Sequence, residues 1–337
     1  MRRGPKIIVN DGERVLEAEA GKPLLFTAMA AKIFIPSACG GRASCGQCRV
    51  RVLSGASEHV SEERALLGAD EIARGVHLAC QLKVTGETRI EMPDGYLRAR
   101  QYHTTVARIR ELAKDMREVE LALLEPPRLS FLAGQYVQFI RPSSESDPRP
   151  LYRAYSMASP PSSDSRLSLL FARVPEGECT SYVFERLHPG EAVTINGPFG
   201  VFQLRESDRP IIFVAGGSGI APIRAILIDM AENRITRPAA FFFSAHAVAD
   251  LVYAEDMRAL ERRLPAFSFI PVLSRPAPED RWEGQTGGLP AALTRLMPDL
   301  DDHEAYLCGG PGLIDASINA LKAKGLRDER IFFDKFS

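Results

Sequence analysis

Four cysteines in the first part of the chain have a spacing that could hold a metal centre. Cys39, Cys45 and Cys48 follow the pattern C-x5-C-x2-C, and Cys80 comes after 31 further residues. Four thiolates complete a [2Fe–2S] cluster, and the glycines between these cysteines let backbone amides approach the sulfur atoms. A structural zinc site is the alternative, but such sites usually present two C-x2-C pairs and this stretch contains one. The spacing therefore predicts a [2Fe–2S] cluster with these four cysteines as metal ligands.

Two glycine-rich turns later in the chain could hold a diphosphate. The first turn, residues 215–222, follows an apolar run and precedes a helical pattern. Its glycines allow close backbone approach, a helix N-terminus favours negative charge, and Pro222 suits a first helical turn. It lacks the G-x-G-x-x-G spacing of the dinucleotide fingerprint, so it is a weak signal by itself. The second turn, residues 309–311, follows Cys308. The residues alone slightly favour the interpretation of Cys308 as a small buried side chain at a strand end.

The elements that must position these residues fall into three segments. Residues 1–97 form a small β-rich unit, with strands at 6–9 and 14–17 around the turn Asp11-Gly12 and a short helix at 62–67 capped by Ser61. Residues 98–206 contain short alternating strands, which predicts an antiparallel barrel. Residues 207–337 alternate strands and helices, which predicts an α/β domain with a parallel sheet and helices on both faces. The expected barrel strands are 105–109, 119–123, 136–140, 167–172 and 192–195.

Composition excludes several classes of function. The formal net charge of −1 argues against sequence-independent binding to nucleic acid, which needs a strong basic excess. No apolar run reaches the ~18–20 residues of a membrane span, and the N-terminal stretch lacks the apolar region of a signal peptide. Disulfides are rare in the cytosol, where clustered cysteines more often bind metal. We therefore expect a cytoplasmic protein with no membrane span in this chain.

On the cysteine pattern, residues 1–97 resemble a plant-type [2Fe–2S] ferredoxin domain, which implies a β-grasp-like α+β fold. The plant spacing is C-x4-C-x2-C, and this chain has one more residue in the first gap. The longer gap resembles the ferredoxin module of Na⁺-translocating NADH:quinone reductase flavoprotein subunits and that of vertebrate-type ferredoxins. This extra residue leaves the expected cluster type unchanged, but it weakens the inference about which electron acceptor the protein uses.

Two motifs in residues 98–206 resemble the flavin motifs of ferredoxin–NADP⁺ reductase-like flavoproteins. The first is the RxYS motif, and the resemblance implies that Tyr155 stacks on the isoalloxazine, Ser156 reaches the flavin N5 and Arg153 faces the FAD pyrophosphate. In the second motif, a hydroxyl and backbone amides at a helix start hold the phosphates. We interpret Cys179, inside it, as packing. The implied FAD-binding residues are Arg153, Ala154, Tyr155, Ser156, Gly177, Cys179, Thr180 and Ser181.

The glycine-rich turns resemble the nicotinamide-binding turns of the same reductases. The resemblance implies that Cys308 lies beside the nicotinamide C4 and the flavin N5. Residues 244–257 contain no arginine to pair with a 2′-phosphate, which favours NADH over NADPH. Phe336, in the aromatic C-terminus, either lies over the flavin face where nicotinamide enters or packs the core under the last strand. The implied nicotinamide-binding residues are Gly216, Gly217, Ser218, Gly219, Pro222, Gly309, Gly310, Pro311 and Phe336, and the catalytic set is Ser156, Cys308 and Phe336.

Together the segments predict an NADH-dependent electron-transfer reductase that moves electrons from NADH to FAD, to the [2Fe–2S] cluster and on to a protein acceptor. The order of segments resembles reductase components of bacterial multicomponent oxygenases, so an oxygenase or other metalloenzyme component is the expected partner. Two alternatives stay open at this point: a peripheral subunit of an NADH:quinone oxidoreductase, and a non-enzymatic redox sensor. Arg42 and Arg49, which flank the cluster loop, could meet an acidic partner or be solvated surface residues.

Overall fold

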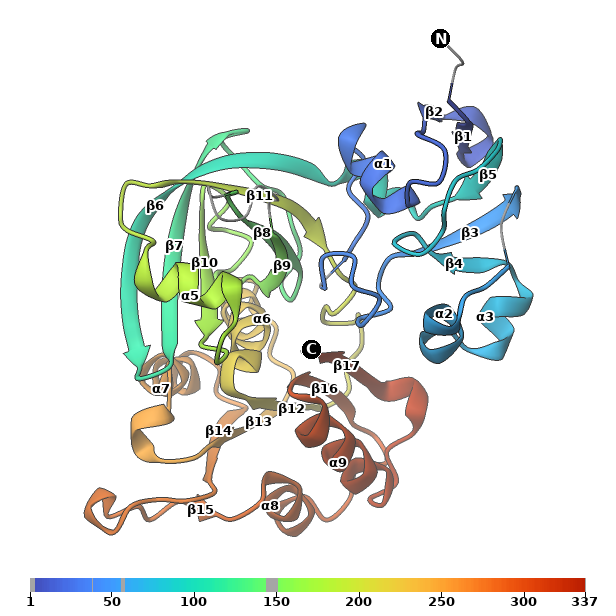
Figure 1. Cartoon of the computed structure of the whole chain (residues 1–337). Coiled ribbons are helices and arrows are strands. Elements are labelled where there is room, and N and C mark those ends of the chain that lie inside the picture. Colours follow the sequence, from blue (N-terminus) through green and yellow to red (C-terminus); the bar gives the residue numbers. More distant parts are fainter. Residues whose placement is uncertain (1–3, 38, 56–57, 144–150, 337) are drawn as a thin grey trace.

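The computed structural model of the chain describes residues 4–37, 39–55, 58–143 and 151–336. Its strands form one five-stranded sheet and two six-stranded sheets, which follow one another along the sequence. Figure 1 shows the N-terminus at the outer end of the first sheet and the C-terminus near the centre, where the three sheets approach one another. The last residues of the chain therefore lie close to all three predicted segments.

The first sheet has the strand order β2-β1-β5-β3-β4. Strands β1 and β2 pair antiparallel, which confirms the predicted hairpin, and β1 pairs parallel with β5. Residues 82–84 add no further strand to this sheet; Lys83 makes an isolated bridge to Pro23. The bounds are β1 Lys6–Val9, β2 Arg14–Glu17, α1 Leu24–Ala30, β3 Arg49–Ser54, α2 Ser61–Leu66, α3 Ala69–Ala73, β4 Val76–Leu78, β5 Thr88–Glu91 and α4 Asp94–Arg98.

The start of α2 differs from the prediction. Ser61 is the first residue of the helix rather than its cap, and its hydroxyl donates to the Glu62 carboxylate. The Glu63 carboxylate instead accepts from the backbone N–H of Val60 at 3.1 Å. A charged acceptor makes a stronger hydrogen bond than a hydroxyl does, so the carboxylate is the group that satisfies this helix end.

The second sheet has the order β10-β7-β6-β11-β8-β9, with antiparallel pairing between neighbours. A bridge between Met157 and Leu169 brings the end of β9 against β10, so the sheet curls into the predicted barrel around an apolar interior. The five predicted strands are present, and β9, which contains the RxYS motif, is an additional one. The bounds are β6 Arg100–Ala113, β7 Met116–Glu125, β8 Tyr136–Arg141, β9 Leu151–Ser156, β10 Arg166–Ala172, α5 Glu178–Glu185 and β11 Ala192–Phe199.

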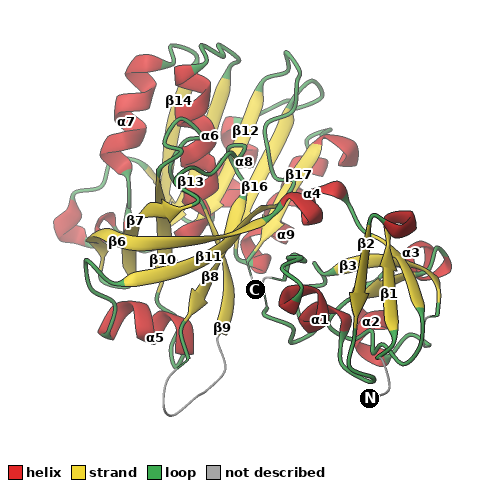
Figure 2. Cartoon of the chain, turned by 90° about the horizontal axis from the view of Figure 1, so that it is seen from above, coloured by secondary structure: helices red, strands yellow, loops and turns green. Residues whose placement is uncertain are grey.

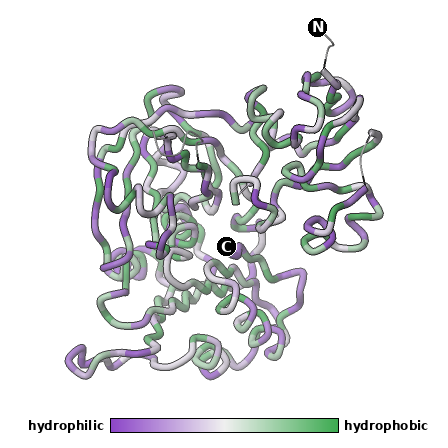
Figure 3. Tube along the Cα trace, viewed as in Figure 1, coloured by the Kyte–Doolittle hydropathy of each residue, from purple (hydrophilic) through white to green (hydrophobic). Residues whose placement is uncertain are grey.

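The third sheet is parallel throughout, in the order β15-β14-β13-β12-β16-β17. Helices α6 and α7 pack on one face and α8 and α9 on the other, as predicted (Figure 2). The central strands are strongly apolar, whereas the loop between β14 and β15 is mostly hydrophilic (Figure 3). The bounds are β12 Ile211–Gly216, α6 Ile220–Glu232, β13 Ala239–Ala245, α7 Ala254–Arg263, β14 Phe267–Leu273, β15 Gln285–Thr286, α8 Leu289–Leu296, β16 Glu304–Gly309, α9 Pro311–Lys322 and β17 Ile331–Lys335.

Strand order in the third sheet reverses between β12 and β16. After β12 the chain adds β13, β14 and β15 on one side, and then returns to place β16 and β17 on the other. Loops at the carboxyl ends of two such strands diverge, which leaves a crevice where ligands bind in open α/β sheets. The two predicted glycine-rich turns follow β12 and β16, so both lie at this crevice.

No helix within the described ranges is both long enough and apolar enough to cross a membrane.

Candidate functional site

The four predicted cluster ligands form two pairs. The Cys45 Sγ donates to the Cys39 Sγ at 3.4 Å, which lowers the pKa of Cys39 and raises that of Cys45. A thiol–thiol hydrogen bond between Cys48 and Cys80 likewise raises the pKa of Cys48 and lowers that of Cys80. Across the described residues, no group of three or more His, Cys, Asp or Glu is arranged to hold one metal ion. Two thiol pairs fit a two-iron cluster, in which each iron takes two cysteines.

The loop around these cysteines is held by Arg49. Its guanidinium donates to the carbonyls of Gly46 and Leu66 and pairs with Glu71 at 2.8 Å. Arg49 therefore supports the cluster loop. This role differs from the two considered from the sequence, which were contact with an acidic partner and a solvated surface residue. Gly46, next to the ligand Cys45, has a φ of +63°, a backbone conformation that glycine adopts without steric cost.

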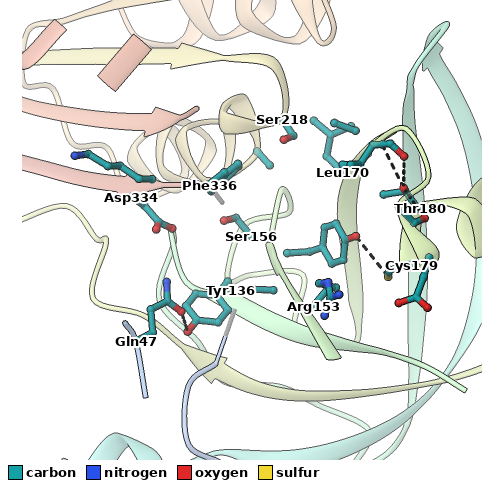
Figure 4. A pocket seen from close by; sticks show the side chains of 18 of the residues that line it. Gln47, Tyr136, Arg153, Ser156, Leu170, Cys179, Thr180, Ser218, Asp334 and Phe336 are labelled. Atoms are coloured by element: carbon teal, nitrogen blue, oxygen red, sulfur yellow. Dashed lines mark hydrogen bonds between the residues drawn. The ribbon is translucent and has the colours of Figure 1, made fainter. Parts of the chain in front are cut away.

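A cavity of about 550 Å³ lies where the three sheets meet (Figure 4). We call it the interdomain cavity. The first sheet contributes Arg42 and Gln47 from the cluster loop, the barrel contributes the RxYS motif, and the third sheet contributes residues around Ser218 and Phe336. Nine of the residues predicted to bind cofactors line it: Arg153, Ala154, Tyr155, Ser156, Gly177, Cys179, Thr180, Ser218 and Phe336.

The barrel wall of the cavity presents an aromatic ring and a hydroxyl. The Tyr155 ring packs against the Phe171 ring at 4.0 Å between centroids, and its hydroxyl donates to the Cys179 Sγ at 3.5 Å. Ser156 is the last residue of β9, and its side chain is 6% exposed. Burial raises the pKa of the Cys179 thiol, which suits packing and not nucleophilic chemistry.

The phosphate motif is built at the start of α5. The Thr180 hydroxyl bonds to the backbone of Val174 and Gly177 at 3.1–3.2 Å, so it holds the preceding loop against the helix. Ser181 does not line the cavity, and its N–H donates to the Gly177 carbonyl at 2.7 Å. The motif therefore forms a fixed turn beside the cavity.

The crevice of the third sheet adjoins the cavity through Ser218 and Ala221. A side chain at Gly219 would collide with the Cys308 carbonyl oxygen at 2.1 Å, so glycine there permits close packing of α6 against β16. Gly217 has a φ of +55°, and no heavy atom lies within 4 Å of the position that a Cβ would take there, which leaves room for a ligand. The other residues of the two turns, Gly216, Pro222, Gly309, Gly310 and Pro311, flank the crevice without lining the cavity.

The two remaining catalytic candidates lie at different depths. Cys308 is fully buried at the end of β16 and is not part of the cavity wall, so its role at the nicotinamide stays a prediction. Phe336 lines the cavity and is partly buried, and its N–H donates to the Gly309 carbonyl at 2.9 Å. This hydrogen bond ties the C-terminal segment to the second glycine-rich turn.

Several cavity residues were not predicted from the sequence. Asp334 comes from β17, and burial raises the pKa of its carboxyl to about 6. The Tyr136 hydroxyl donates to the Gln47 Oε1 at 2.8 Å, which links barrel and cluster loop. For most of these residues the available signal was a neighbouring position in a motif, namely the cysteine loop, the start of α5, the first glycine-rich turn or the C-terminal stretch. Tyr136 on β8 and Leu170 and Ala172 on β10 lie outside those motifs. The cavity residues that were not predicted are Arg42, Gln47, Tyr136, Leu170, Ala172, Val174, Glu176, Glu178, Ala221, Asp334 and Lys335.

The comparison with solved structures supports this arrangement. The cytochrome P450 reductase GcoB from Amycolatopsis is 29% identical, with a TM-score of 0.80 and coverage of 98% of both chains. The ferredoxin reductase in carbazole 1,9a-dioxygenase is 24% identical, with a TM-score of 0.75 and coverage of 99% of this chain and 98% of that one. The second likeness establishes the fold.

Three sequence families match consecutive parts of the chain. They are a 2Fe-2S iron-sulfur cluster binding domain over residues 7–85, an oxidoreductase FAD-binding domain over 103–204 and an oxidoreductase NAD-binding domain over 213–318. The cofactors are therefore a [2Fe–2S] cluster, FAD and NADH, and the protein is an oxidoreductase that transfers electrons from NADH through FAD to the cluster.

Curated relatives match nearly the whole chain. The F subunit of the Na(+)-translocating NADH-quinone reductase of Neisseria meningitidis serogroup C / serotype 2a is 33% identical over 97% of this chain and 90% of its own length. The corresponding protein of Klebsiella pneumoniae subsp. pneumoniae is 33% identical over 98% of this chain and 90% of its own length. The chain thus belongs to the family of iron–sulfur flavoproteins represented by the F subunit of the Na(+)-translocating NADH-quinone reductase.

Proposed function

We propose that the protein is the reductase component of a system in which a separate oxygenase or other metalloenzyme receives its electrons. The observation that carries this proposal is the likeness to a cytochrome P450 reductase, which extends over 98% of both chains at 29% identity. The cluster loop supports it, since Ser44 in that loop is exposed and could meet a partner protein.

The side chains that line the cavity suggest how the cofactors are held. FAD, when bound, accepts an electron pair as hydride and releases electrons singly, which a [2Fe–2S] cluster can take one at a time. Tyr155 would support the flavin ring, Ser156 would donate a hydrogen bond toward its reactive nitrogen, and Arg153 would bind the diphosphate. Close packing of these walls would exclude water from the site.

The cluster would lie close to the flavin because its loop packs on β8 and β9. The Arg153 Nη1 donates to the carbonyl of the ligand Cys39 at 3.4 Å, and the Gln138 amide donates to the Ser37 carbonyl at 3.0 Å. At Gly40, an added side chain would meet the Tyr152 carbonyl oxygen at 2.8 Å. These contacts support transfer within one chain, without a diffusional step between flavin and cluster.

The test of this electron path is a cluster-free variant of the full chain. Cys80→Ser should lose the ~2 irons of the cluster and with them NADH-dependent reduction of ferric cytochrome c, a one-electron protein acceptor. FAD content and ferricyanide reduction should persist. Cys179→Ser, the same change away from the cluster, should keep its iron. Cytochrome c reduction that survives in Cys80→Ser would contradict the proposal.

The 33% identity to a component of NADH-quinone reductase favours a second candidate, in which the chain is a peripheral subunit of a quinone-reducing complex. Washed membranes from cells with and without the protein would distinguish the two. If NADH-dependent reduction of ubiquinone-1 disappears without the protein and returns when purified chain is added, the second candidate holds and the first fails.

We propose domain boundaries at 97/98 and 206/207 and a cytoplasmic location. The first boundary falls inside α4, one residue before its end, and the second lies between β11 and β12. The six cysteines are free, which supports a reducing compartment.

A further inference from the structure

Two guanidinium groups, one from the cluster loop and one from the barrel, meet at one carbonyl oxygen beside the interdomain cavity. The Arg42 Nε donates to the Cys39 carbonyl at 3.1 Å, and the Arg153 Nη1 donates to the same oxygen at 3.4 Å. Both side chains line the cavity. Arg42 belongs to the loop between the ligands Cys39 and Cys45, whereas Arg153 belongs to β9 of the barrel. The two positive charges therefore face the same space from opposite sides of a domain boundary.

Neither guanidinium has a carboxylate within ion-pair distance among the described residues. Glu176, Glu178 and Asp334 also line the cavity, but they form no ion pair with Arg42 or Arg153 there. Two neighbouring cations that form no ion pair with a carboxylate can receive an anion, and guanidinium groups match phosphate oxygens especially well.

We propose that Arg42, from the cluster-binding loop, is a ligand of the FAD diphosphate together with Arg153, so that bound FAD fastens the cluster loop to the barrel. FAD is the phosphate-bearing group for which this cavity is built, since the RxYS and α5 motifs line the same wall. Flavin binding and docking of the cluster domain are then linked, and each strengthens the other. The role differs from contact with an acidic partner protein, which would leave flavin affinity independent of Arg42.

The test compares Arg42→Gln with Arg14→Gln in the full-length protein. Arg14 is an exposed residue of β2, the outer strand of the first sheet, so the control removes the same charge far from the cavity. After removal of FAD, each protein is titrated with FAD and with riboflavin, which has no phosphate, while flavin fluorescence is followed. Arg42→Gln should raise the Kd for FAD about tenfold or more and leave the Kd for riboflavin within ~twofold of the control, since one charge-assisted hydrogen bond typically accounts for a factor of that size.

The linkage between FAD binding and docking of the cluster domain gives a second readout that does not depend on activity. Bound FAD should slow thermal bleaching of the cluster absorbance in the control protein, and less so in Arg42→Gln. Equal FAD affinity in the two variants would overturn the proposal, as would an equal loss of affinity for FAD and riboflavin. If Arg42→Gln cannot retain its cluster, Arg42→Lys preserves the charge. Near-control FAD affinity in Arg42→Lys supports the proposal, and a loss as large as that of Arg42→Gln contradicts it.

Discussion

Asp334 is a carboxyl group in the cavity whose ionisation is opposed by its burial. It lies opposite Cys308 in the pairing of β16 with β17, and its charge also reaches Tyr136. Burial raises the pKa of this carboxyl to about 6, above the usual value near 4. The folded protein therefore binds this proton more tightly than the unfolded chain does. The free energy of unfolding therefore falls as the pH rises from about 4 to about 6. Above about pH 6 this loss of stability stays constant.

Replacement of Asp334 by Asn should remove the loss of stability that ionisation of this buried carboxyl causes. With FAD saturating, we expect Asp334→Asn to stabilise the protein by at most about 3 kcal/mol at pH 7.5 and by about half as much at pH 5. Thermal melts at the two pH values measure this difference. Glu58→Gln, at an exposed position, should change neither melt. An equal gain at both pH values would show that ionisation of Asp334 is not the cause.

We expect Arg275 to decide how strictly NADH is preferred over NADPH. Residues 244–257 lack an arginine, but the loop after β14 brings the Arg275 Nη2 to 3.2 Å from the His246 Nδ1, just beyond the end of β13. Any residual use of NADPH should then depend on this guanidinium. We expect a higher kcat/KM with NADH, and Arg275→Ala should lower kcat/KM for NADPH about tenfold while changing NADH by less than ~twofold. Steady-state ferricyanide assays measure kcat/KM with NADH and with NADPH. A parallel loss with both cofactors would refute this role of Arg275.

At the scale of elements, a buried polar network joins the barrel to the third sheet. The Tyr253 hydroxyl, before α7, donates to the Glu118 carboxylate of β7, and Arg110 pairs with the same carboxylate at 3.2 Å. The Arg224 guanidinium of α6 lies 4.6 Å from the Tyr253 ring centroid and donates to the Ala158 carbonyl at 2.6 Å. These contacts set the position of the crevice of the third sheet relative to the barrel wall of the interdomain cavity.

Loss of the Tyr253 hydroxyl should therefore affect both stability and hydride transfer. Tyr253→Phe leaves a buried carboxylate with one partner fewer, which should cost about 1–3 kcal/mol in the free energy of unfolding. It should also slow flavin reduction by NADH, because a small displacement of reacting groups lowers the rate steeply. Tyr182→Phe removes a tyrosine–glutamate hydrogen bond between α5 and the residue before β11, which does not reach the third sheet. Stopped-flow flavin bleaching should be slower in the first variant alone, and equal rates would contradict the prediction.

At the scale of the whole molecule, the C-terminal segment reaches the centre where the three sheets meet (Figure 1). Phe336 packs against the large core cluster and also lines the cavity, so the structure retains both roles considered for it. As a gate, its ring would compete with nicotinamide for the flavin face. Phe336→Ala should then bind NAD⁺ more tightly, with slower product release. Titration with NAD⁺, followed by flavin absorbance, and thermal melts distinguish the two roles. An unchanged affinity for NAD⁺ together with a lowered melting temperature would mean that Phe336 only packs the core.

The sequence alone determined the elements and the cofactor motifs. The hairpin at Asp11-Gly12, the alternating barrel strands and the parallel sheet follow from local periodicity and turn chemistry, which act over a few residues. The cysteine spacing likewise predicted the cluster, because the loop that carries three of the ligands is short. Ser61 was misassigned as a cap because the competing Glu63 carboxylate also lies within one helical turn.

Only the tertiary structure decided what surrounds the cofactors. Arg42, Tyr136 and Asp334 are far apart in the sequence, and burial at the contacts between sheets brings them into one cavity. The same applies to Arg275 beside His246 and to Tyr253 beside Glu118. Periodicity reports which face of an element is apolar, but not which other element covers that face. The site is therefore a property of the packing between domains, and its motifs mark only one part of each wall.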